Sequence, residues 1–151
     1  MRARLQMLVL LAILLAAIDL VVALATVHVH PEFGHHRSHT WIALSALDCV
    51  VMAILARLPS RAVAVGCGLL VGGQLGNLIW AVGHNGVVSN PLVIRAGEGG
   101  VAFTFADVCE LIGVWVLMVG LIEVTFRHRH LLPQESVAVR LARRISVALR
   151  D

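Results

Sequence analysis

Four apolar runs, each interrupted by few charged residues, dominate the pattern of hydrophobic and polar positions along the chain. A run of about 18 apolar residues or more predicts a membrane-spanning helix, because an α-helix rises about 1.5 Å per residue and the hydrocarbon core is roughly 30 Å thick. The second run is short for a span. The sequence therefore predicts four transmembrane helices, at residues 5–27, 40–56, 62–82 and 101–126.

The residues after the fourth run have a different pattern. In residues 134–151 the apolar side chains fall near one helical stripe and arginines fill the rest. This is typical of a basic amphipathic helix on an anionic membrane surface, although a frayed tail or a helix that docks on a partner would have the same pattern. We expect a four-helix transmembrane domain over residues 1–130 and a basic amphipathic tail over residues 131–151.

Composition and charge agree with a membrane protein and set its orientation. The chain is 59% hydrophobic and only 14% charged, which is too apolar for a soluble domain of this length. All basic residues are arginines, and all but Arg37 and Arg95 flank the first run, the tight connection at 57–61 or the end of the fourth run. The positive-inside rule then places both termini in the cytoplasm. We expect an all-α, multi-pass protein of a bacterial-type cytoplasmic membrane. The topology explains the arginines, so no nucleic-acid partner is expected.

Acidic residues within the apolar runs are candidates for a functional site, because an ionised side chain at membrane depth costs about 3 kcal/mol unless it is paired or solvated. We expect Glu123, near the cytoplasmic end of the fourth run, to pair with Arg127. The other four acids of this kind are Asp19, Asp48, Asp107 and Glu110.

Asp107 lies at the outer end of the fourth run, beside polar loops. In an aspartic dyad, one ionised and one protonated carboxyl group activate water for amide cleavage, so Asp107 is a candidate for one half of such a pair. Glu110 lies one turn deeper on the same helical face. A structural aspartate, bonded to Asn77 or to loop amides, is an equally good interpretation.

The outer loop at residues 28–39, "HVHPEFGHHRSH", is rich in histidine. Clustered imidazoles can bind Zn²⁺ or Cu²⁺, and His28 and His30 are weak candidates because no defined ligand spacing completes a site. Proton sensing is another interpretation, and a solvated polar loop is the favoured one. We expect no cofactor. In the third run, Gly68, Gly72 and Gly76 form a small-xxx-small pattern, which favours close packing within the bundle over dimerisation.

Three segments together resemble one known family. They are "GGQLGNLI" (72–79), "GVV" (86–88) and "FTFAD" (103–107). They are similar to the motifs G-G-x-x-G-N-x-x-D-R, G-x-V-V-D and F-N-x-A-D of the lipoprotein signal peptidases (signal peptidase II), membrane aspartic peptidases with four transmembrane helices and both termini cytoplasmic. Asp19 looks like the aspartate of the family's D-x-x-x-K motif. The resemblance extends over about residues 19–121.

The chain departs from this family where the chemistry lies. The resemblance maps the family's two catalytic aspartates to Trp80 and Asp107, so the first acid is missing and the second is retained. The His-rich loop lacks the family's Asn-Gly motif and, by analogy, the length for its small extracytoplasmic β-platform. The other departures are Ala81 for an arginine, Thr104 for an asparagine, Ser89 for an aspartate and Ala23 for a lysine.

A lone carboxylate cannot divide the work of acid and base between two groups. The favoured hypothesis is a signal peptidase II-like membrane protein that has lost peptidase activity. It would act as an accessory or assembly subunit or bind lipid or lipoprotein, and its partners would be membrane lipid, a lipoprotein or a larger membrane complex. Its site would be Asp107, supported by Asn77, Asp19 and Thr104.

Two alternatives stay open. One is an active lipoprotein signal peptidase in which Glu110 or Asp48 serves as the second acid. The other is a metal- or proton-handling membrane protein that uses the His-rich loop together with Asp19 and Asp48.

Overall fold

The computed structural model describes residues 1–28, 33–96 and 99–131, and the chain is mostly helical. The helices are α1 (Arg2–Thr26), α2 (His39–Leu55), α3 (Arg61–Gly83) and α4 (Phe105–Arg127). The strands are β1 (Gly34–His36), β2 (Val87–Ser89), β3 (Leu92–Ala96) and β4 (Gly99–Phe103), and a 3₁₀ turn, η2 (Arg129–Leu131), follows α4.

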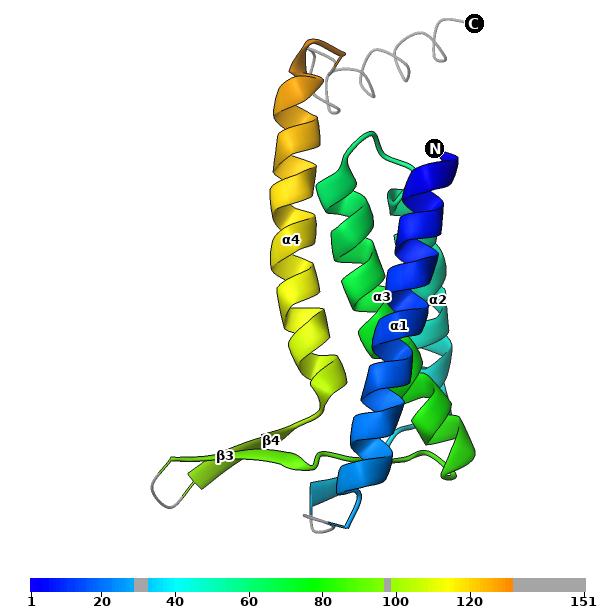
Figure 1. The fold of residues 1–151 in the computed structure, drawn as a ribbon, viewed down its shortest axis with the longest axis vertical. Coiled ribbons are helices and arrows are strands. Elements are labelled where there is room, and N and C mark those ends of the chain that lie inside the picture. The colour runs from blue at the N-terminus through cyan, green and yellow to red at the C-terminus, as the bar shows by residue number, and fades with distance from the viewer. Residues whose placement is uncertain (29–32, 97–98, 132–151) are drawn as a thin grey trace, which may run out of the picture.

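α3 is the central helix of the bundle. It packs against α1, α2 and α4, and these helices run along the long axis of the molecule (Figure 1). We compared burial over the most apolar 18 residues of each helix. In α3, 61% of this stretch is buried, but in α1 and in α4 only 28% is. α3 is therefore surrounded by protein, whereas α1 and α4 each leave a broad face uncovered.

The glycine stripe of α3 explains how closely α1 approaches. A Cβ added at Gly68 would meet the side chain of Leu11 at 3.0 Å, and one at Gly72 would meet Leu15 Cβ at 2.8 Å. Gly76, one turn further on, faces Asp19 in the same way. The two helices thus keep the same four-residue step along their contact. The prediction that these glycines pack within the bundle is confirmed.

Three helices, α1, α3 and α4, are long and apolar enough to cross a membrane, and α2 is shorter at 17 residues. The uncovered faces of α1 and α4 are apolar, as lipid contact requires. Their exposed residues include Leu10, Ile13, Leu14 and Val21 on α1 and Leu111, Trp115, Val119 and Phe126 on α4. The positions of the four apolar runs are confirmed as helices, except that the fourth helix begins at Phe105 and not at 101. Residues 101–103 belong to β4, because they pair with β3.

The strands lie together at one end of the bundle. The loop between α1 and α2 contributes β1, which pairs antiparallel with β2 of the loop between α3 and α4 through His35↔Val88. β3 and β4 form a hairpin that projects away from the helices (Figure 1). The helical bundle therefore carries small β-structure that an all-α description omits.

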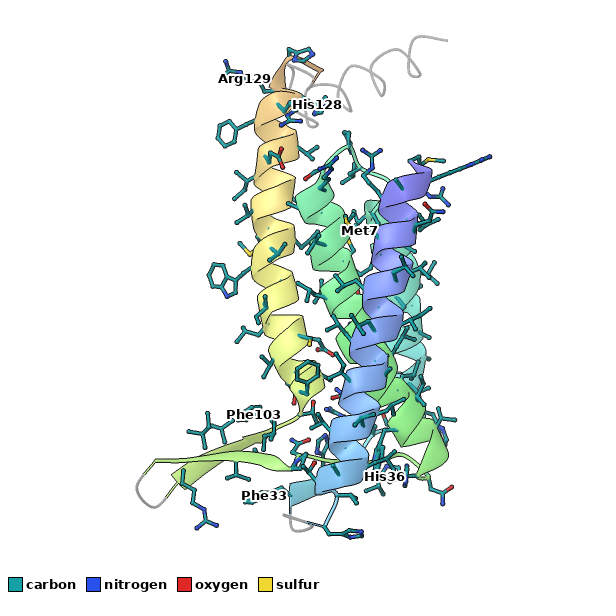
Figure 2. The ribbon with its side chains drawn as sticks, in the orientation of Figure 1. Met7, Phe33, His36, Phe103, His128 and Arg129 are labelled. Carbon is teal, nitrogen blue, oxygen red and sulfur yellow. The ribbon has the colours of Figure 1, made fainter. Side chains whose placement is uncertain are left out.

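The opposite end holds the N-terminus, the connection between α2 and α3, and the end of α4. His128 and Arg129 lie there, far from His36 at the stranded end (Figure 2). Arg127 Nη2 donates to Glu123 Oε1 at 2.8 Å, as predicted, and Ser60 Oγ donates to Glu123 Oε2 at 2.9 Å. The predicted basic tail lies outside the described residues, apart from Leu131.

Candidate functional site

Asp107 is held by a reciprocal pair of hydrogen bonds at the start of α4. Thr104 Oγ1 accepts from the Asp107 N–H at 3.1 Å, and Asp107 Oδ2 accepts from the Thr104 N–H at 2.7 Å. This is a capping box, which satisfies backbone donors that the first turn of a helix leaves unpaired. Asp107 is half-buried and keeps its second carboxylate oxygen free of hydrogen bonds from the described residues. A backbone amide, and not Asn77, supplies its bond.

Asp19 ties α1 to the same helix start. It is 4% exposed, and its Oδ1 accepts from the Ala106 N–H at 2.8 Å. A carboxylate beside a helix N-terminus also interacts favourably with the helix dipole. Gly76 has no side chain, and this leaves Asp19 the space to reach α4. We call Asp19, Thr104, Ala106 and Asp107 the acidic junction.

Glu110 lies next to the acidic junction and faces α3. Its Cγ would be 2.9 Å from a Cβ at Gly73, so it packs on the surface of that glycine. It lies within electrostatic reach of Asp107, Asp48 and Arg37. Its carboxylate makes no hydrogen bond within the described part of the chain. Asp19 and Asp107 accept hydrogen bonds from backbone amides, whereas the carboxylate oxygens of Glu110 have no hydrogen-bond partner among the described residues.

Asp48 is engaged on the other side of α3. Its Oδ2 accepts a hydrogen bond from Gln74 Nε2, and Cys49 Sγ lies 3.7 Å from Gln74 Oε1 as a weak donor. Gln74 therefore bridges α2 and α3 and satisfies a carboxylate at membrane depth. Asn77, also on α3, is 3% exposed. The structure brings Asp19, Asp107 and Glu110 together but gives Asp48 a separate partner.

Trp80 occupies the position to which the resemblance assigns the family's first catalytic aspartate, and its surroundings are apolar. It is 7% exposed and forms a cluster with Ala81 and Val88, which we call the Trp80 cluster. The His84 ring stacks on the indole with centroids 4.0 Å apart. The residues packed against the cluster come from α1, the turn after it and α2: Leu20, Ala23, Val27 and Trp41. Ala23, which replaces the family's lysine, is among them.

The histidines between α1 and α2 are divided among different places. His35 and His36 lie on β1, His28 follows α1, and His30 lies outside the described residues. No group of three His, Cys, Asp or Glu residues that could hold a metal ion occurs in the described ranges. Burial, together with Arg37, lowers the pKa of His35, while Asp107 and a hydrogen bond to the backbone of Phe33 oppose that shift. His35 is therefore within electrostatic reach of both Arg37 and Asp107.

Three residues of this region were not singled out from the sequence. Arg37 lies within electrostatic reach of Glu110, and its guanidinium carbon is 4.6 Å from the centre of the Trp41 ring. Gln74 is the hydrogen-bond partner of Asp48. Gly86 has a positive φ of 85° in an Asn-Gly turn. The Asn-Gly dipeptide is a turn signal that was available in the sequence.

Comparison of the chain with known protein families, curated proteins and solved structures finds no match. The resemblance to signal peptidase II therefore rests on the motifs in the chain alone.

Proposed function

We propose that this chain is a signal peptidase II-like integral membrane protein without peptidase activity, which binds membrane lipid or a lipoprotein as an accessory subunit. In this proposal it has four membrane spans and both termini in the cytoplasm of a bacterial-type cell. The observation that carries the proposal is the environment of Trp80. An ionised acid is replaced by a buried indole, and the neighbouring cluster is apolar.

The state of Asp107 supports the same proposal. The carboxylate that the resemblance retains already has a structural role in the capping box with Thr104. Aspartic catalysis needs two carboxyl groups that face a shared water, one acting as base and the other as acid. Within the described residues, no hydrogen bond links Asp107 to Asp19 or Glu110. Thr104 and Asp107, two of the residues that carry the resemblance, therefore have a role in the fold that does not involve cleavage.

A cleavage assay tests the loss of activity directly. The purified protein in detergent micelles is incubated with a diacylated lipobox peptide, and an active signal peptidase II serves as the positive control. We expect no cleavage above the rate with heat-inactivated protein, and no change in Asp107→Asn. Cleavage by the wild type that Asp107→Asn abolishes would contradict the proposal.

Binding is tested in the same preparation. We expect the wild type to retain the uncleaved diacylated peptide or copurified lipid, or to copurify from mild detergent with a larger membrane complex. A monomer that retains neither lipid nor peptide and copurifies with no other membrane protein would remove the accessory role.

An active enzyme with Glu110 as the second acid is the other candidate, and one observation favours it. Glu110 lies within electrostatic reach of Asp107 and has no hydrogen-bond partner in the described part of the chain. If cleavage is detected, Glu110→Gln and Asp107→Asn should each abolish it. Asp48→Asn is the matched control, because Asp48 is bonded to Gln74 on the other side of α3.

A further inference from the structure

A cavity of about 540 Å³ lies at the stranded end of the bundle, between the start of α2 and the end of α3. This volume is in the range of small-molecule sites, which is roughly 300–1,000 Å³. Its lining includes the basic residues Arg37, His36 and His39, which we call the basic wall, and the apolar residues Ile42 and Val82, which we call the apolar wall. We call it the Arg37 cavity. It is separate from the acidic junction, none of whose residues line it.

The basic wall of the Arg37 cavity is held in place by the β1–β2 junction. The Arg37 N–H donates to Gly86 O at 2.8 Å, just beyond the last pair of the two strands. Gly86 has a positive φ, and a Cβ there would meet both Arg37 O and the His36 ring at 2.9 Å. Only a glycine fits this position without displacing the two basic residues. The loop is therefore built around a fixed placement of Arg37 and His36.

The donors of the cavity favour an anion. Arg37 Nε is buried and has no partner within the described residues, although a buried donor normally has one. His36 and His39 are exposed, and an imidazole offers at least one N–H donor whether neutral or protonated. None of the described residues lining the cavity is acidic. Glu110 lies within electrostatic reach of Arg37, but it is on α4, outside the lining.

The position of the cavity favours a lipid as the carrier of that anion. His39 begins α2, and Gly83 ends α3, so the basic wall lies where the apolar helices stop. Val82 is 65% exposed and, with Ile42, continues the cavity wall along the apolar parts of the two helices. Trp41, against which Arg37 packs, is of the residue type found at membrane–water interfaces. A phospholipid would match both walls with one molecule.

We propose that the Arg37 cavity binds the phosphate-bearing headgroup of a membrane phospholipid, with Arg37, His36 and His39 on the phosphate and an acyl chain along Ile42 and Val82. This deepens the lipid-binding part of the proposed function and does not depend on the loss of peptidase activity. The phosphate accepts hydrogen bonds from Arg37 and the imidazoles, and binding involves no covalent step.

Native mass spectrometry of the detergent-purified protein, titrated with phosphatidylglycerol, tests the proposal. We expect Arg37→Gln to weaken binding at least about tenfold, equivalent to about 1.4 kcal/mol, because it removes a hydrogen bond between two charged groups. Arg95→Gln is the matched control, since Arg95 is an exposed arginine of β3 at the same end. It should change the affinity less than twofold. Equal affinities for wild type and Arg37→Gln would overturn the proposal.

A second variant keeps the test decisive if Arg37→Gln does not fold, as judged by helical circular dichroism. The double substitution His36→Gln and His39→Gln changes two exposed side chains and should leave the helices intact. We expect it to weaken phosphatidylglycerol binding by about three- to tenfold. Binding unaffected by this pair, in a folded protein, would also overturn the proposal.

Two further ligands separate a lipid from a free anion. Diacylglycerol, which has no phosphate, should bind wild type and Arg37→Gln equally. Inorganic phosphate at millimolar concentration should compete only weakly, because it lacks the apolar contact. Full displacement of the lipid by phosphate would overturn the lipid assignment. A wild type that neither cleaves peptide nor binds phosphatidylglycerol through Arg37 would defeat this inference alone, whereas peptide cleavage would defeat only the loss of peptidase activity.

Discussion

The acidic junction and the Trp80 cluster both lie at the stranded end of the bundle, yet they hold the molecule together by different means. In the acidic junction, two carboxylates accept hydrogen bonds from backbone amides at the start of α4. In the Trp80 cluster, a buried indole packs on small and branched apolar side chains. The resemblance would place one acid of a catalytic pair in each region. The acidic junction has its acid in a helix cap, whereas the Trp80 cluster has apolar packing at the position that the resemblance assigns to an acid.

This difference sets what a substitution in each region should cost. A helix cap stabilises the fold whether or not the carboxylate also reacts, so Asp107 has a structural role by itself. An acid at position 80 would have to be solvated or paired at the edge of the membrane, and Ala23 and Ala81 provide neither a cation nor a donor. The largest effects of substitution are therefore expected in the Trp80 cluster.

Returning an acid to position 80 is the strongest way to break the comparison. We expect Trp80→Asp to lower the free energy of unfolding by about 4 kcal/mol, because it removes a large buried ring and places a carboxylate among apolar groups. Trp80→Phe, which keeps an apolar ring, should cost about half as much or less. Reversible unfolding in mixed micelles, followed by circular dichroism, measures both. A stable Trp80→Asp that gained peptide cleavage would contradict this account.

Removing the buried acid of the junction is expected to have the next largest effect. Asp19→Ala leaves the Ala106 N–H without its acceptor and should lower the free energy of unfolding by about 3 kcal/mol. Arg127→Ala removes an exposed ion pair with Glu123 and should cost less than about 1 kcal/mol. Similar losses for the two variants in the same unfolding assay would show that the Asp19 bond contributes no more than a surface pair.

Two glycines of α3 sharpen the role of close packing. A Cβ at Gly76 would run into the Asp19 side chain, whereas a Cβ at Gly83 would meet nothing within 4 Å. We expect Gly76→Ala to lower the free energy of unfolding by about 2 kcal/mol through overpacking. Gly83→Ala, at the end of the same helix, should change it by less than about 1 kcal/mol. Thermal unfolding of both variants gives the difference, and equal transitions would argue against the Gly76–Asp19 contact.

Thr104 tests whether the cap needs a hydroxyl or only an acceptor. Thr104→Ala removes the acceptor of the Asp107 N–H and should cost about 1 kcal/mol of unfolding free energy. Thr104→Asn provides another strong N-cap side chain and should cost less than about 0.5 kcal/mol. Thermal unfolding of the two variants measures the difference between their unfolding free energies. A larger loss for the asparagine variant would mean that Thr104 acts through packing and not through its cap.

The smallest expected effect is a pH dependence from His35. Because burial lowers the pKa of His35 below its ordinary value of 6.5, the unfolded chain binds this proton more readily than the folded protein. The free energy of unfolding should therefore decline as the pH falls through about 6.5, where the unfolded chain begins to take up the proton. Unfolding measured between pH 8 and pH 5 should show a shallower decline in His35→Gln. Superimposable pH profiles would exclude this contribution.

The helices themselves were predictable because hydropathy is a local property. The apolar runs match α1 to α4 closely, and the glycine stripe of the third run indicated close packing. The cap of α4 was visible as "TFAD", which has the Thr-x-x-Asp form of a capping box. Thr104 was instead interpreted as a departure from the family's asparagine and as a supporting residue of the Asp107 site. The strands were missed because each is short and depends on a partner from another loop.

The sequence by itself determined that the chain has long apolar helices suited to a membrane, that several acids lie within the apolar segments, and that Trp80 stands where the resemblance calls for an acid. Only the tertiary structure decided what each acid does. Asp19 and Ala106 are far apart along the chain and meet because glycines set the distance and stagger between α1 and α3. The direction of a side chain around its helix, and the helix it then faces, are properties of packing that no local pattern contains.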